Sequence, residues 1–180
     1  NEDNNSLVLL MPFDEDNSTT AIDTGDFKNN GVLGDITVGT QPTISTNCVT
    51  GTCYSFDGVN DYINIPNSYT FNSNQTTVEA WVYRSGISRN EEIISKYLVA
   101  GNQRQWFLRL SNQNKAVFLV SSDGLNVPSD IGATTIANNT WAHLVGVYNG
   151  TAIMIYVNGV YDGGTPTYND SGIYFSNAKL

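Results

Sequence analysis

The chain has 180 residues, with 8 Lys and Arg against 17 Asp and Glu, so its formal net charge is -9. This charge would repel a phosphate backbone or an anionic bilayer, which excludes nucleic acid as an expected partner. The acidity is consistent either with cation binding or with the solubility of an exported protein.

Charged residues make up only 14% of the chain, against about 25% in typical proteins. Asn, Thr, Ser and Gly replace them, together with ten Tyr and seven Phe. β-Branched and aromatic residues fit a pleated sheet, while Gly and Asn supply turn conformations. The composition therefore predicts an all-β domain.

The first third of the chain reads as short strands separated by turns. Residues 7–13 form an apolar run that predicts a short strand. Pro12 limits the length of this strand, because proline has no backbone N–H to donate to a neighbouring strand. Residues 23–31 have the composition of an irregular loop, and a short strand begins at Val32. Residues 54–65 are typical of two strands joined at Asp57-Gly58 as a hairpin.

The remaining strands follow at a spacing of about 11 residues, which is typical of a β-sandwich. The strongest is 76–84, where both alternating faces carry apolar or aromatic bulk, as in an inner strand. The other expected strands are residues 92–97, 105–110, 116–121, 141–148 and 152–157, the last two joined at Asn149-Gly150. No linker interrupts the pattern, so we expect one domain over residues 1–180.

The two cysteines, Cys48 and Cys53, lie five positions apart around a Thr-Gly turn. With no second cysteine pair and no histidine cluster they make a poor zinc site, which wants four ligands. A disulfide is the better interpretation, and it predicts an oxidising compartment. The longest apolar run, residues 7–11, is too short to cross a bilayer, so we expect no membrane insertion by this segment.

Export would also expose N-glycosylation sequons to modification. Their number is only slightly above that expected by chance in a chain so rich in Asn, Ser and Thr. The candidate acceptors are Asn4, Asn17, Asn74, Asn138, Asn149 and Asn169.

Four segments in this order resemble a known family: Leu-Met-Pro-Phe-Asp-Glu at 10–15, Phe-Asp-Gly-Val-Asn-Asp-Tyr-Ile at 56–63, Val-Glu-Ala-Trp-Val at 78–82, and Trp-Ala-His-Leu-Val-Gly-Val-Tyr at 141–148. Together they are similar to the laminin-G-like, concanavalin A-like lectin and glucanase superfamily found in microbial surface proteins. The resemblance implies a jelly-roll sandwich of two antiparallel sheets. It also implies a closing strand with an acidic motif beyond Leu180.

The loop at 23–31 offers hard oxygen ligands from Asp23, Asp26 and Asn30, which calcium prefers. Members of the resembling family often hold a calcium ion at such a place. The alternative is a turn in which these side chains cap their own backbone. The residues leave both interpretations open, and a bound calcium ion would be structural.

No catalytic residue is expected. The single histidine, His143, lies in a core-like strand without an evident nucleophile partner. Glycoside hydrolysis needs two carboxylates about 5 to 10 Å apart, but Glu91 and Glu92 would point to opposite faces of one strand. Glu79 stands alone between apolar residues. We therefore expect no enzyme.

Exposed aromatic side chains would indicate sugar binding, and Tyr97, Trp106, Tyr161 and Tyr168 are available. Because the tryptophans lie in strand patterns, we expect most of them in the core, so no ligand-binding residue is assigned. The expected function is a non-catalytic extracellular binding or adhesion module that recognises glycan or protein at a cell surface. The alternative is a structural subunit that assembles with copies of itself in a filament or surface layer.

Overall fold

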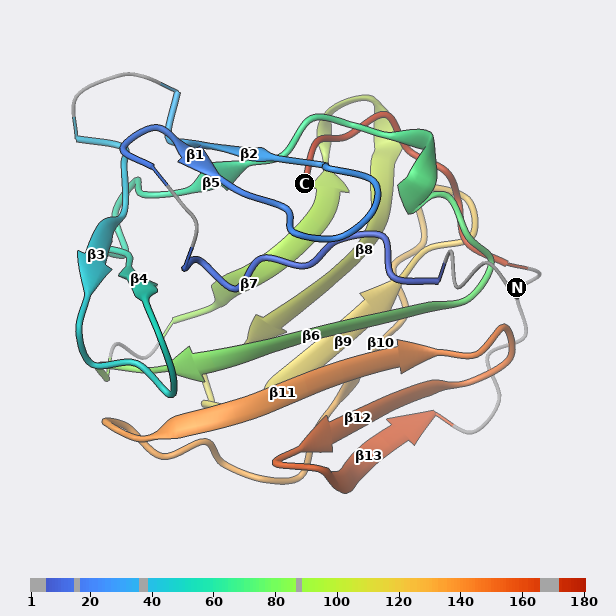
Figure 1. Ribbon diagram of the computed structural model, residues 1–180. Helices are drawn as coiled ribbons and strands as arrows, with labels where there is room; N and C mark the ends of the chain where they lie inside the picture. Colours follow the sequence, from blue (N-terminus) through green and yellow to red (C-terminus); the bar gives the residue numbers. More distant parts are fainter. Residues whose placement is uncertain (1–5, 15–16, 36–38, 87–88, 166–171) are drawn as a thin grey trace, which may run out of the picture. The chain divides into compact units, whose positions relative to one another are not determined.

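The computed structural model describes residues 6–14, 17–35, 39–86, 89–165 and 172–180, which form strands, turns and two short 3-10 helices (Figure 1). The chain divides into two compact units, Asn1–Phe71 with Lys179–Leu180 (unit 1) and Asn72–Ala178 (unit 2). This division does not test the expectation of one domain over residues 1–180, which stays a prediction. No helix of the described residues is long and apolar enough to span a membrane.

Unit 1 contains two small antiparallel sheets and the 3-10 helix η1 (Tyr69–Phe71). In the first sheet, β2 (Gly31–Leu33) lies between β1 (Thr20–Ala21) and β5 (Ile63–Asn64). The second is the hairpin of β3 (Thr43–Ser45) and β4 (Cys53–Ser55).

Two expectations for this unit are wrong. Residues 7–13 are not a strand, because the Leu10 N–H donates to the Asp23 carboxylate and the Leu10 carbonyl accepts from the Thr24 N–H. Residues 54–65 are not one hairpin, because β4 pairs with β3 whereas β5 pairs with β2. Asp57 Oδ1 accepts three successive N–H groups, those of residues 59–61, and holds the intervening segment as a local turn.

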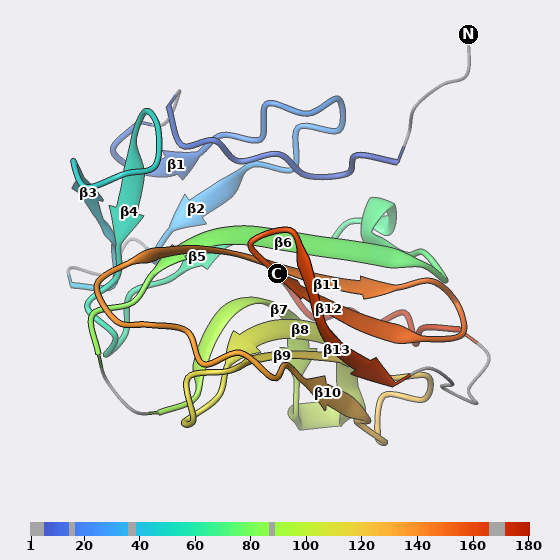
Figure 2. The ribbon, with the colours of Figure 1, turned by 90° about the horizontal axis from the view of Figure 1, so that it is seen from below.

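Unit 2 is a sandwich of two four-stranded antiparallel sheets (Figure 2). The first, in the order β13-β12-β11-β6, consists of Val160–Thr165, Ile153–Val157, Trp141–Tyr148 and Thr76–Tyr83. The second, in the order β10-β9-β8-β7, consists of Ser129–Ile131, Ala116–Val120, Gln103–Leu110 and Glu91–Leu98, with the 3-10 helix η2 (Ala100–Asn102) before β8. The prediction of an all-β sandwich is confirmed.

The core of unit 2 lies between these sheets. Inward-facing residues of β11 alternate with outward-facing ones along its whole length, while all five residues of β9 are buried. Leu144 and Phe118 are fully buried, and a Cβ added at Gly146 of β11 would come within 2.3 Å of the Phe118 ring of β9. A side chain at position 146 would therefore collide with the facing sheet, and glycine is required there.

The C-terminal segment 172–178 runs beside the second sheet. The Tyr174 N–H donates to the Ser121 carbonyl, and the Ser176 N–H donates to Gln105 Oε1. The fully buried Lys96 of β7 donates from Nζ to the carbonyls of Ser176, at 2.9 Å, and Ala178, at 2.6 Å. These hydrogen bonds hold the segment against the second sheet, although it is not paired with that sheet as a β-strand.

Candidate functional site

The outer face of the first sheet of unit 2 carries a group of aromatic side chains. Antiparallel pairing of β6 with β11 places Trp81 opposite His143 and Tyr83 opposite Trp141. Because side chains alternate along a strand, residues 77, 79, 81 and 83 of β6 share one face with residues 141, 143, 145 and 147 of β11. We call this surface the aromatic face: Trp81, Tyr83, Trp141, His143, Tyr156 and Tyr161.

Trp81, on the edge strand β6, is the exposed tryptophan of the aromatic face. Its side chain is 52% exposed, and its ring centroid lies 5.0 Å from that of His143 with a tilt of 31°. His143 Nε2 lies 3.5 Å from Glu79 Oε2. A half-exposed indole thus stands beside an imidazole and a carboxylate, which combines an apolar platform with polar groups that can accept or donate hydrogen bonds.

Two further aromatic pairs extend the face. The rings of Tyr83 and Trp141 lie 5.6 Å apart, one row along the strands from Trp81. On β12 and β13, the rings of Tyr156 and Tyr161 meet edge to face at 5.7 Å. Large exposed apolar groups gathered on one sheet face are typical of a binding surface.

The expectation that most tryptophans are core residues holds only for Trp106, which is 4% exposed. Trp81 is exposed, and Trp141 is partly buried at the start of β11. The available signal was Thr77 and Glu79, which share an alternating set with Trp81 and Tyr83 and favour the solvent face for that set. The aromatic bulk of the same set favours the core, so the pattern alone does not decide between them. Tyr161 is exposed on the aromatic face, Tyr97 packs on the buried Phe107 with its ring 5.4 Å away, and Tyr168 lies outside the described residues.

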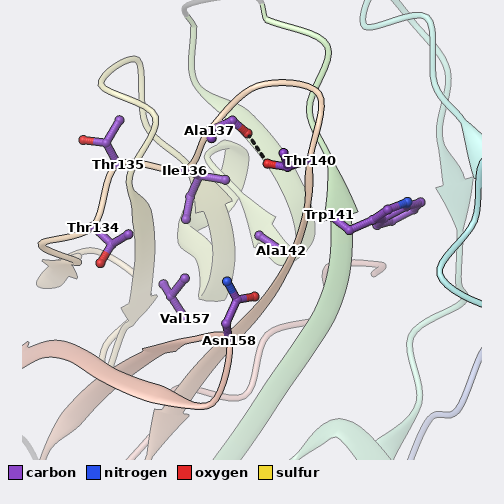
Figure 3. A pocket seen from close by; sticks show the side chains of 9 residues that line it. All are labelled: Thr134, Thr135, Ile136, Ala137, Thr140, Trp141, Ala142, Val157 and Asn158. Carbon is purple, nitrogen blue, oxygen red and sulfur yellow. Dashed lines mark hydrogen bonds between the residues drawn. The ribbon is translucent and has the colours of Figure 1, made fainter.

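A shallow hollow of about 190 Å³ lies elsewhere in unit 2, where β11 begins and β12 ends (Figure 3). Figure 3 shows the side chains of Ile136, Val157 and Asn158 turned toward one another, while the Trp141 indole points away. Ligand pockets usually measure about 300 to 1,000 Å³. The hollow is smaller than that, so the aromatic face is the stronger candidate site.

The three glutamates that the sequence analysis considered for hydrolysis each lie beside a different basic side chain. Glu91 accepts from Arg84 Nε at 3.0 Å, and Glu92 lies 3.6 Å from Arg109 Nη1. Burial raises the pKa of Glu92 above the usual carboxyl range, and the nearby Arg109 opposes that rise. Each of these carboxylates faces its own arginine, whereas Glu79 faces His143.

Cys48 and Cys53 are joined by a disulfide in the β3–β4 hairpin, with Cα atoms 5.6 Å apart. This confirms the predicted pairing. The bridge closes the loop that connects the two strands.

The loop at 23–31 has its own hydrogen-bond network. Asp23 is fully buried, and its Oδ1 accepts the N–H groups of Leu10 and Gly25 while Oδ2 accepts that of Asn29. Three of the roughly four acceptor positions of a carboxylate are thereby used. The loop is thus held by a buried carboxylate that caps backbone donors.

The other two expected calcium ligands do not join Asp23 as a ligand set. Asn30 Oδ1 accepts the Asp23 N–H at 2.9 Å, and Asp26 is exposed. No group of three His, Cys, Asp or Glu side chains among the described residues is placed to hold a metal ion. This arrangement is that of a capped turn, and it does not fit an ion that takes six to eight oxygens.

A melting experiment tests whether the loop at 23–31 binds calcium. Since the Asp23 and Asn30 oxygens already accept backbone N–H groups, we expect the same melting temperature in millimolar calcium and in chelator. A bound ion at a hundredfold excess over its Kd would instead stabilise the folded state by about 2.7 kcal/mol. If calcium raises the melting temperature of the wild type by several degrees and leaves that of Asp23→Asn unchanged, the loop does bind calcium.

Four of the six candidate glycosylation sites lie in described residues, and all four are exposed: Asn17, Asn74, Asn138 and Asn149. Asn4 and Asn169 lie outside the described residues. Asn138 Oδ1 accepts from Arg84 Nη1 at 2.7 Å, and Asn149 Oδ1 caps the N–H groups of residues 151 and 152. Glycosylation at these asparagines stays a prediction.

Comparison with known protein families assigns the fold. The family model described as the concanavalin A-like lectin/glucanases superfamily matches residues 57–179, more than half of the chain. The chain belongs to this superfamily. Concanavalin A-like membership agrees with the antiparallel sandwich and identifies it as a jelly roll, as the resemblance implied.

Solved structures of similar fold support this assignment. The receptor binding domain of botulinum neurotoxin mosaic serotype C/D is 14% identical with a TM-score of 0.73; the alignment covers 97% of this concanavalin A-like chain and 42% of the neurotoxin chain. Domain 4 of AbnA, an extracellular arabinanase from Geobacillus stearothermophilus solved with arabinotriose, is 18% identical with a TM-score of 0.60. The alignment covers 87% of this chain and 74% of the arabinanase domain.

A third neighbour is an S-layer domain-containing protein from Clostridium thermocellum, 22% identical with a TM-score of 0.54, covering 88% of this chain and 72% of that one. At these identities the likeness shows the fold alone. The chain spans less than half the length of the botulinum neurotoxin binding-domain chains that it matches. No curated protein sequence matches it.

Proposed function

We propose that this chain is a non-catalytic extracellular binding module that recognises a glycan through the aromatic face of unit 2. The observation that carries the proposal is Trp81, an indole left half-exposed on a sheet face beside His143 and Glu79. Burying such an indole on a partner recovers apolar area that the fold leaves in water.

The chemistry of this surface suits a saccharide. One face of a pyranose or furanose ring presents C–H groups that can stack on the indole, while its hydroxyls need hydrogen-bond partners at the ring edge. The Glu79 carboxylate, 64% exposed, can accept from such hydroxyls. A few polar groups around an apolar surface are the usual composition of a small-ligand site.

Supporting observations come from the fold and from its neighbours. The superfamily includes lectins by its description, and the arabinanase domain of similar fold was solved with a bound arabinotriose. The disulfide between Cys48 and Cys53 agrees with an oxidising, extracellular compartment. The separate partners of Glu79, Glu91 and Glu92 favour binding without hydrolysis.

Truncating the indole tests the proposal. Trp81→Ala should weaken glycan binding at least about thirtyfold, because truncating an aromatic anchor costs about 2 kcal/mol or more. A neutral glycan array identifies the ligand, and isothermal titration with the wild type and the variant measures the loss.

Phe175→Ala is the matched control. Phe175 is 46% exposed, close to the value for Trp81, but belongs to the segment beside the second sheet. It should bind like the wild type. If Trp81→Ala, folded by circular dichroism, binds the array hits as tightly as the wild type, the aromatic face is not the glycan site.

A further inference from the structure

The aromatic face offers a second stacking position next to Trp81. Tyr83 follows two residues later on β6, is 38% exposed, and pairs with Trp141 of β11. Two residues along a strand correspond to about 6.8 Å at about 3.4 Å per residue. Trp81 and Tyr83 therefore stand in one line on the same strand, close enough for neighbouring rings of one saccharide chain.

The charges on this sheet restrict the class of saccharide. Glu79 and Asp162 are the only Asp, Glu, Lys or Arg residues in β6, β11, β12 and β13. Arg84, directly after Tyr83, is 4% exposed, and its guanidinium donates to Glu91 and Asn138. The described residues of these four strands thus present carboxylates and no lysine or arginine, which disfavours an anionic sugar.

We infer that the ligand is a neutral oligosaccharide of at least two rings, which lies along β6 with one ring on Trp81 and the next on Tyr83. This inference rests on the proposed function and extends it to the length, direction and charge of the glycan. The other exposed aromatic residue of the face, Tyr161, lies three strands away on β13, roughly 14 Å across at about 4.8 Å per strand. A neighbouring ring of the same saccharide cannot span that separation.

The experiment compares saccharides of one and three residues on matched variants. The probes are arabinose and arabinotriose, glucose and cellotriose, and mannose and mannotriose, with trigalacturonic acid as the anionic counterpart. Each is titrated into the wild type, Trp81→Ala, Tyr83→Ala and Tyr161→Ala. Melting curves establish that every variant is folded.

We expect at least one neutral trisaccharide to bind the wild type about tenfold or more tighter than its monosaccharide, because a second ring gains a second aromatic contact. Tyr83→Ala should remove this gain, and it should lower the monosaccharide affinity much less than Trp81→Ala does. Tyr161→Ala should lower the trisaccharide affinity much less than Tyr83→Ala does, because Tyr161 lies three strands away from Trp81. Trigalacturonic acid should bind more weakly than the neutral trisaccharides.

The failures are distinguishable. If no saccharide of either length binds the wild type, the proposed function is wrong and the inference falls with it. If saccharides bind through Trp81 without a gain from length, or if Tyr161→Ala and not Tyr83→Ala removes the gain, glycan binding stands and only the inferred arrangement is overturned. Equal binding of trigalacturonic acid would overturn the inferred charge class.

Discussion

Gly146→Val should lower the free energy of unfolding of unit 2 by about 3 kcal/mol or more, the upper range for overpacking a core. The added Cβ would lie 2.3 Å from Cγ and Cδ2 of Phe118. Phe118 is fully buried in β9, so a shift of its ring would disturb other packed core side chains. Urea denaturation followed by tryptophan fluorescence measures the loss.

Removing atoms from Phe118 tests whether the collision with its ring causes this loss of stability. Phe118→Leu removes atoms from the side chain that Gly146 faces, so Gly146→Ala combined with Phe118→Leu should be more stable than the sum of the two single changes predicts. Val145→Ala, one residue along β11 on the outer face, is the control and should cost less than Gly146→Val. A stability of Gly146→Val within about 0.5 kcal/mol of the wild type would show that the sheets can separate freely here.

The stability of the protein should rise between about pH 8 and pH 10.5 through Lys96. Desolvation by burial lowers the pKa of Lys96 from 10.5 to about 8. Below pH 8 the amine is protonated in both the folded and the unfolded chain, so the cost of burying the charge is present in full. Above pH 8 the folded state releases the proton first, and the unfolded state then binds more protons.

The expected gain relative to a variant without this amine is up to about 3 kcal/mol, from about 1.36 kcal/mol for each unit of pKa difference. Lys96→Met keeps the length of the side chain and removes its titration. Urea denaturation of both proteins at a series of pH values gives the difference in their free energies of unfolding. Tyrosine ionisation affects both proteins alike and cancels in this difference.

A difference that stays constant from pH 7 to pH 10.5 would contradict the assigned titration of Lys96. The geometry supplies a second readout. Lys96 Nζ donates to the carbonyls of Ser176 and Ala178 in the C-terminal segment. Lys96→Met should therefore increase hydrogen exchange at the Ser176 and Tyr174 amides, which belong to the same segment and donate to the second sheet and the residue after β9. Unchanged protection there would mean that the segment is held without the lysine.

Most strands of unit 2 could be predicted from the sequence, because their side chains follow a period of two over five to eight residues. β6, β11 and β12 lie within one residue of their expected bounds. β10 and β13 were not predicted, and the wrong assignments concern unit 1, where strands have only two or three residues. There the Asp23 carboxylate takes the Leu10 N–H, and Asp57 turns the chain locally, so side chains compete with the ladder for backbone donors.

At the candidate site too, the sequence predicts the strand but not which of its faces is exposed. In β6, one alternating set is Val78, Ala80 and Val82 and the other includes Trp81 and Tyr83, so apolar content does not decide which set faces water. Pairing with β11 decides it, because it places Gly146 on the side of Phe118 and Trp81 on the side of His143.

Composition, alternation and the order of four short segments were enough to establish the β class, the sandwich and the superfamily, because these depend on local periodicity and turn chemistry. The disulfide followed from the spacing of the two cysteines. Tertiary structure alone decided the burial of Lys96, the capping by Asp23 and the exposure of Trp81. Each of these depends on which distant strand or segment covers a side chain, and that is a property of the packed sheets rather than of any sequence window.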